Sequence, residues 1–178
     1  SFLLAAASLL AIPVAPAQTL AQTLAQAGAT PAPVSAPSSA IPRGRLSDAV
    51  IPQSYRLDLT LDPTRERFSG RAEIDALLKA RGGSIFLHGR HLAIRKASAI
   101  VGGRTIAAQW REVDASGVAE LTFAEPLPAG PVTLAFEYEG QFNDGPAGLF
   151  RVKVGDEWYS WSQFQSTDAR TAFPSFDQ

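Results

Sequence analysis

The chain has 178 residues, which is enough for one domain with appended segments, and its formal net charge is −1 at pH 7. A charge this close to balance does not indicate the basic surface that nucleic-acid-binding proteins use, so we expect no nucleic-acid partner. Cysteine is absent, which excludes a disulfide framework, a thiolate metal site and a thiol nucleophile.

The N-terminal residues have the pattern of a secretory signal peptide. Residues 2–12, FLLAAASLLAI, form a short apolar run, and an A-x-A cleavage pattern follows at residues 15–17, with a second at residues 25–27. The run is shorter than the roughly 20 apolar residues that span a bilayer, so no membrane span is expected. We predict a truncated signal peptide over residues 1–17 and a secreted or periplasmic location. A buried helix is the alternative.

The next segment, residues 18–45, has the composition of a linker. It contains the short repeat TLAQTLAQ and then a run rich in Ala, Pro and Ser. Such a composition buries too little apolar surface to offset the entropy of ordering the chain. We therefore predict a disordered linker over residues 18–45 and a folded domain over residues 46–178.

The folded part has the period-two pattern of β-strands. Tyr55, Leu57 and Leu59 alternate with polar residues, and Asp62-Pro63 ends this first strand. Residues 125–128, EPLP, are predicted to interrupt the sheet, and residues 76–80 are the one doubtful stretch in a domain with no ordinary helix. The pattern predicts an all-β domain. Its further strand-like segments are 68–78, 85–88, 92–101, 105–113, 118–123, 132–138, 148–151 and 157–165.

Two histidines, His88 and His91, stand in the word HGRH. Zinc hydrolases usually place two histidines at i and i+4 on a helix, whereas these are three apart and follow a strand. We interpret them as polar residues at a sheet edge. Glu137 and Glu139 alternate with aromatic residues and are interpreted as a solvated strand face, so no catalytic residue is predicted.

A pair of glutamines near the C-terminus, Gln163 and Gln165, is the candidate binding site. If residues 159–165 are extended, Trp161 and both glutamines point to the same side of the strand. Amide oxygens accept hydrogen bonds without titrating, and an indole face attracts cations, so this side suits an ammonium group. A plain polar strand face is the alternative.

Three charged residues follow the glutamines. Asp168, Arg170 and Asp177 are predicted to form a charge-assisted bridge that holds the turn before Pro174. We assign them a structural role.

Residues 162–177, SQFQSTDARTAFPSFD, resemble the segment T-Q-F-E-x-T-D-A-R-x-A-F-P-C-F-D of the zinc aminopeptidases of the aminopeptidase N (gluzincin) type. Weaker similarities occur in the same order along the chain. They cover residues 51–61, 68–78, 85–94, 136–140 and 148–151.

The resemblance implies a saddle-shaped domain of mostly antiparallel, twisted sheets that caps the cleft of a downstream catalytic domain. The residue at the position of Gln165 binds the free α-amine of the substrate in that family, and Gln163 lies beside it. Many members carry Glu where this chain has Gln165. Two lesser departures are Ser175, where Cys is frequent, and Gln178, where the family has Glu.

The expected function is that of an N-terminal fragment of a secreted zinc metalloaminopeptidase, a protease that hydrolyses N-terminal residues from peptides. Its partners would be a peptide with a free N-terminus and its own downstream catalytic domain. The chain contains neither the G-x-M-E-N nor the H-E-x-x-H motif, so we expect no zinc ligands here, no activity of the fragment alone, and a gene that continues past Gln178. The alternatives are a non-catalytic aminopeptidase-like scaffold and a secreted β-sandwich binding module.

Overall fold

The computed structural model describes residues 40–177, which lie in one compact unit over residues 36–178. The predicted signal peptide and most of the predicted linker lie outside the described residues. The described part consists of strands and one short 3-10 helix. Its elements are β1 (Val50–Thr60), β2 (Arg67–Leu78), β3 (Gly82–His88), β4 (Ala93–Val101), β5 (Arg104–Asp114), β6 (Val118–Leu127), β7 (Gly130–Gln141), β8 (Gly148–Val154), β9 (Glu157–Gln163) and η1 (Asp168–Thr171).

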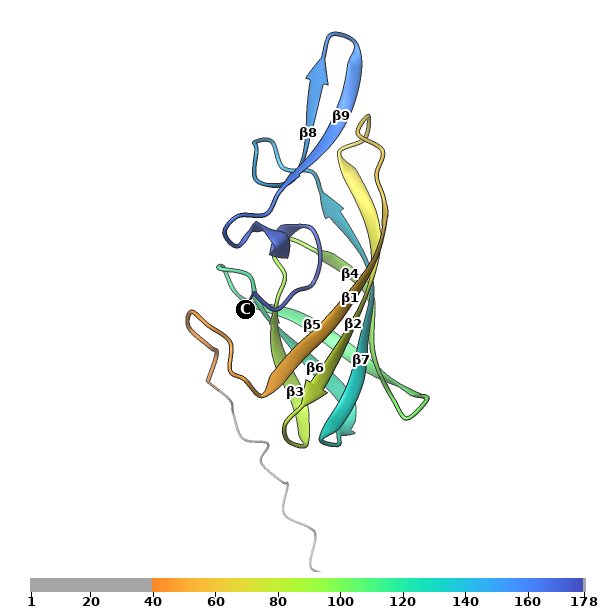
Figure 1. Ribbon diagram of the computed structural model, residues 1–178, viewed down its shortest axis with the longest axis vertical. Helices are drawn as coiled ribbons and strands as arrows, with labels where there is room; N and C mark the ends of the chain where they lie inside the picture. Colours follow the sequence, from red (N-terminus) through yellow and green to blue (C-terminus); the bar gives the residue numbers. More distant parts are fainter. Residues whose placement is uncertain (1–39, 178) are drawn as a thin grey trace, which may run out of the picture. The chain divides into compact units, whose positions relative to one another are not determined.

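Seven strands form one antiparallel sheet in the order β1-β2-β7-β4-β5-β6-β3, and β8 and β9 form a separate hairpin (Figure 1). The predicted all-β, antiparallel architecture is therefore confirmed. β1 and β3 are the two edges of the large sheet, yet both contact the segment that follows η1. The sheet is consequently curled, as the right-handed twist of strands favours.

The core lies on the inner face of the curled sheet. β2 and β7 run side by side in register and bury alternate residues, among them Ile74 and Leu134, which are fully inaccessible to solvent. The residues in between project to the outer face, where Arg56 pairs with Glu73. Burial of apolar surface at about 25 cal/mol per Å² drives this arrangement, since exposed ion pairs contribute little.

The edge strand β1 keeps much of its apolar side exposed. Tyr55, Leu57 and Leu61 remain 37–38% accessible although they alternate as a core-facing strand would. The described residues cover this strip only in part. Exposed apolar patches of this kind are characteristic of surfaces that contact another domain or molecule.

The predicted interruption at residues 125–128 is wrong, because β6 continues to Leu127. The ladder with β3 steps from Ser84↔Thr122 to Gly82↔Leu127, so Pro126 lies in an irregular stretch of pairing. Proline lacks a backbone N–H and is tolerated at such bulges. The doubtful residues 76–80 complete β2 and the turn after it, and they form no helix.

A close approach of backbone and ring requires glycine at position 140. A Cβ atom there would lie 2.2 Å from the Phe68 ring, which belongs to the residue paired with Gly140 across the ladder. We expect Gly140→Ala to lower the free energy of unfolding by about 1–3 kcal/mol because the ring must shift. Urea unfolding measures the effect. Gly83→Ala is the matched control, since a Cβ atom there meets nothing within 4 Å. Equal stability of the two variants would contradict this packing.

Candidate functional site

The two candidate glutamines lie where β9 ends and a turn begins. Gln163 is the last residue of β9 and pairs with Gly148 of β8, whereas Gln165 is in the turn that follows. The Asp168 N–H donates to the Phe164 carbonyl at 3.1 Å and closes this turn. The prediction that residues 159–165 are extended throughout is therefore wrong at its end, and the turn decides the direction of the Gln165 side chain.

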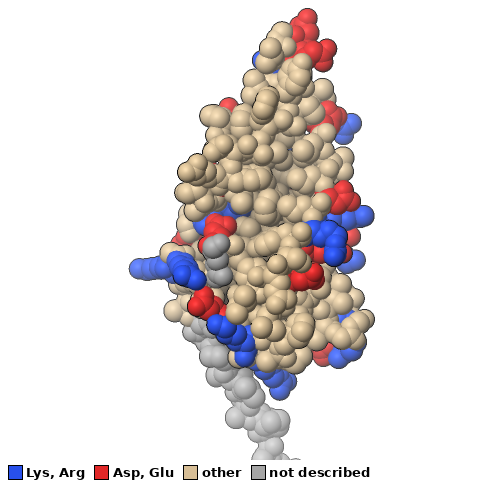
Figure 2. Space-filling model, viewed as in Figure 1, with Lys and Arg blue, Asp and Glu red and all other residues tan. Residues whose placement is uncertain are grey.

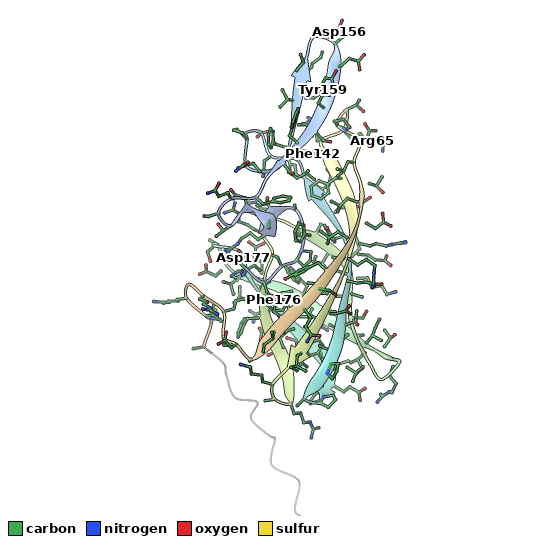
Figure 3. All side chains as sticks on the ribbon, viewed as in Figure 1. Arg65, Phe142, Asp156, Tyr159, Phe176 and Asp177 are labelled. Atoms are coloured by element: carbon green, nitrogen blue, oxygen red, sulfur yellow. The ribbon has the colours of Figure 1, made fainter. Side chains whose placement is uncertain are left out.

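Both glutamine side chains are exposed, and neither forms a side-chain hydrogen bond with the rest of residues 40–177. Trp161, two residues before Gln163 on β9, is 60% accessible, and Tyr159 is 48% accessible. Figure 3 shows Tyr159 on the β8–β9 hairpin. Alternate residues of a strand share a face, so two exposed rings and the Gln163 amide lie on one side of the hairpin. The site thus offers amide acceptors next to aromatic faces.

The residue between the glutamines holds the turn to the domain. Phe164 is partly buried, and its ring packs edge-to-face on Phe173 at a centroid distance of 5.7 Å. Phe173 follows η1, whose Thr171 hydroxyl donates to the Asp168 carbonyl. The anchoring ring and the exposed amides therefore come from adjacent residues that face in different directions.

The segment after η1 joins the two edges of the large sheet. Ser175 pairs with His88 of β3 through two backbone hydrogen bonds of 2.7 and 2.8 Å. On the other side, the Phe176 N–H donates to the Tyr55 hydroxyl of β1 at 2.9 Å. Figure 3 shows Phe176 and Asp177 in this segment, in front of the sheet.

Arg170 and Asp177 form the predicted bridge, but Asp168 does not join it. The Arg170 Nε donates to Asp177 at 2.8 Å and its Nη1 donates to the Ser116 carbonyl at 2.5 Å, with the Arg170 side chain 11% accessible. Asp168 instead lies 3.6 Å from the Arg90 guanidinium. The bridge therefore connects the C-terminal segment to the β5–β6 turn as well as to itself.

His88 is buried rather than merely polar at an edge. It ends β3 as expected for an edge position, but only 2% of it is accessible. Its Nδ1 accepts a hydrogen bond from the Asp177 N–H at 3.2 Å, which places the ring proton on Nε2. Burial lowers the pKa of His88, although the nearby Asp177 carboxylate opposes this shift and Arg170 adds to it. The imidazole is consequently neutral near pH 7.

Residues 88–91, HGRH, connect β3 to the β5–β6 turn and to η1, a role that the sequence analysis did not predict. The Gly89 N–H donates to the Gly117 carbonyl and the Arg90 N–H to the Arg170 carbonyl, both at 2.8 Å. A Cβ atom at Gly89 would lie 2.6 Å from the Trp110 ring. The one available signal was a glycine between charged and polar residues directly after a strand.

Within residues 40–177, no group of three or more His, Asp or Glu side chains is arranged to hold a metal ion. The zinc that the resemblance implies thus finds no fitting ligand set in this part of the chain. The same residues contain no helix long and apolar enough to cross a membrane.

Comparison with known proteins identifies the family. Residues 51–178 match the family described as the Peptidase M1 N-terminal domain. The chain is 34% identical over 137 residues to the probable M1 family aminopeptidase 1 of Encephalitozoon cuniculi, 31% identical over 144 residues to the human endoplasmic reticulum aminopeptidase 1, and 28% identical over 148 residues to the puromycin-sensitive aminopeptidase of Caenorhabditis elegans. The chain therefore belongs to the M1 aminopeptidase family, and residues 51–178 form the N-terminal domain that characterises this family.

These alignments cover 75–79% of this chain but only 15–16% of the relatives. The chain thus spans about one sixth of the length of the aminopeptidases that it matches.

The buried imidazole predicts a pH-dependent stability. His88 has a folded-state pKa below its usual 6.5, so the unfolded chain binds its proton first and stability falls as the pH drops below about 6.5. We expect the free energy of unfolding to decline between about pH 7.5 and 5.5 in the native chain and to decline less in His88→Asn, whose amide oxygen replaces the Nδ1 acceptor. Denaturant unfolding at both pH values measures this difference.

His91→Asn is the control, because His91 is exposed and asparagine tolerates its positive φ of 59°. An identical decline in His88→Asn and the native chain would contradict the assignment. Four carboxylates also stabilise the fold, but their contribution is lost only at more acidic pH. Hydrogen bonds from neighbouring side chains hold their pKa values below the usual range. These carboxylates are Asp62, Asp75, Asp114 and Glu139.

Proposed function

We propose that this domain is the N-terminal part of a zinc aminopeptidase, where it caps the catalytic cleft and binds the free α-amine of the peptide substrate through Gln165. The observation that carries the proposal is the pair of exposed amides, without side-chain hydrogen bonds inside residues 40–177, at the end of β9. The M1 family membership supports it, since the named relatives are aminopeptidases.

In this proposal Gln165 recognises the substrate and takes no part in proton transfer. Its Oε1 accepts a hydrogen bond from the substrate ammonium, and Gln163 and the exposed Trp161 ring contribute a second acceptor and a cation–π contact. A glutamate at this position would add charge attraction. Gln165 therefore binds the ammonium less tightly and without a titration of its own.

The partner of the exposed apolar surfaces is proposed to be the downstream catalytic domain of the same polypeptide. The described residues leave the strip on β1 partly exposed and the hairpin residues Val154 and Trp161 63% and 60% accessible. In the view of Figure 2, a broad uncharged area extends below the acidic tip of the hairpin. Zinc would be held by residues of that domain and would supply Lewis acidity and an activated water.

A non-catalytic scaffold of the same family is the second candidate. It shares the domain described above and differs only in a degenerate downstream half. Membership in the M1 family excludes the unrelated β-sandwich binding module. Bound zinc and chelator-sensitive hydrolysis of an aminoacyl substrate by the full-length protein separate an enzyme from a scaffold.

The test of the α-amine contact uses the full-length enzyme. Gln165→Ala removes a hydrogen bond to a charged group, worth about 1.5–3 kcal/mol, so we expect kcat/KM for aminoacyl substrates to fall by about 10- to 150-fold. Gln165→Glu should lower KM, most strongly at low ionic strength. Steady-state kinetics measures both.

Gln109→Ala is the matched control, because Gln109 is an exposed glutamine on β5. Aminoacyl kinetics of Gln165→Ala equal to those of the native enzyme would refute the assignment.

We infer an exported location from residues 1–17, whose pattern is that of a signal peptide. N-terminal sequencing of the exported protein is expected to show cleavage after Ala17 or after Ala27. Deletion of residues 2–12 should retain the protein in the cytoplasm, whereas export of the deleted form would contradict this location. Deletion of residues 29–39 is the control and should leave export unchanged.

A further inference from the structure

Three aromatic rings connect the edge strand β1 to the turn that carries Gln165. The Tyr55 ring packs edge-to-face on Phe173 at a centroid distance of 6.3 Å, with an angle of 63° between the ring planes. Phe173 in turn contacts Phe164 at 5.7 Å and 87°. Edge-to-face contacts have a preferred geometry, so each ring restricts the orientation of the next.

Tyr55 holds the backbone of the same segment as well. Its hydroxyl accepts the Phe176 N–H hydrogen bond at 2.9 Å, three residues beyond the Phe173 ring. Burial raises the pKa of Tyr55 and the Asp177 charge raises it further, while the hydrogen bond from Phe176 lowers it. The hydroxyl is therefore neutral near pH 7, and Tyr55 contacts the C-terminal segment through both its ring and its oxygen.

The turn at Gln165 has few other attachments to the large sheet. The strand before it, β9, pairs only with β8, and the pair β8–β9 is a sheet of its own. The hydrogen bond that closes the turn, from Asp168 to Phe164, lies within the segment itself. The Phe164 ring, directly before Gln165, packs on Phe173, and Phe173 in turn connects the turn to Tyr55 on β1.

We propose that Tyr55 is a positioning residue for substrate binding, which acts through Phe173 and Phe164 to hold the turn that presents Gln165. This inference rests on the proposed function, because it concerns the same α-amine contact. Tyr55 lies 110 residues away in sequence and does not touch the substrate. It determines where the Gln165 amide oxygen stands relative to the ammonium.

The experiment compares Tyr55→Leu and Tyr55→Phe in the full-length enzyme. Leucine keeps an apolar side chain but removes the ring contact, whereas phenylalanine keeps the ring and removes only the hydroxyl. We expect Tyr55→Leu to raise KM for an aminoacyl substrate about three- to tenfold, while kcat changes by no more than about twofold. The expected rise in KM corresponds to the free energy of one edge-to-face contact. Tyr55→Phe should restore most of the native KM.

Ile51→Ala is the matched control, since Ile51 also lies on β1, with 37% accessibility against 38% for Tyr55, and is not part of the apolar strip of Tyr55, Leu57 and Leu61. Thermal unfolding of each variant detects a general loss of stability. The decisive measurement is the double variant Tyr55→Leu with Gln165→Ala. If Tyr55 acts through Gln165, the effect of Tyr55→Leu on KM disappears when Gln165 is already absent.

The outcomes separate the two hypotheses. An unchanged KM in Gln165→Ala overturns the proposed function, whatever Tyr55 does. A raised KM in Gln165→Ala together with a native KM in Tyr55→Leu overturns the positioning role alone. An equal rise of KM from Tyr55→Leu in both backgrounds also overturns it, because Tyr55 would then act independently of Gln165.

Discussion

The structure depends on the tie that residues 173–177 make between the two edges of the curled sheet. Ser175 pairs with His88 of β3 through two backbone hydrogen bonds. The next residue, Phe176, donates its N–H to the Tyr55 hydroxyl on β1. Edge strands expose unpaired backbone groups, and this segment pairs with those of β3, whereas it holds β1 through the Tyr55 side chain. The candidate site lies directly before this segment in the chain, and its position follows from the tie.

Buried charges make this tie specific. The Arg170 guanidinium donates hydrogen bonds to the Asp177 carboxylate and to the Ser116 carbonyl. The Asp177 N–H donates to the neutral ring of His88. Such a network adds little net stability, because desolvation offsets much of the Coulombic attraction. Removing a single partner is costly, since it leaves a buried charge without compensation. The network therefore selects one register for the segment more than it strengthens the fold.

The candidate site divides into rigid supports and free acceptors. Phe164 faces inward onto Phe173, whereas the amides on either side of it stay exposed and make no side-chain hydrogen bond within residues 40–177. Acceptors held in this way suit the recognition of an ammonium group, because a preorganised ligand contact loses less entropy on binding. The neighbouring Tyr159 and Trp161 rings are exposed as well, and exposed apolar groups of this kind are characteristic of interaction surfaces.

The sequence by itself determined the β-strands and the family, because side-chain alternation and a specific C-terminal word are local properties that survive without coordinates. It singled out Gln163 and Gln165 as candidates, and it predicted the Arg170–Asp177 pair that the structure contains. Only the tertiary structure decided that β6 passes through Pro126, that Gln165 stands in a turn, and that His88 is buried. The reason is physical: each of these depends on partners far away in sequence, such as Ser175 against His88 and Phe173 against Tyr55, and burial is a property of those contacts rather than of the residue.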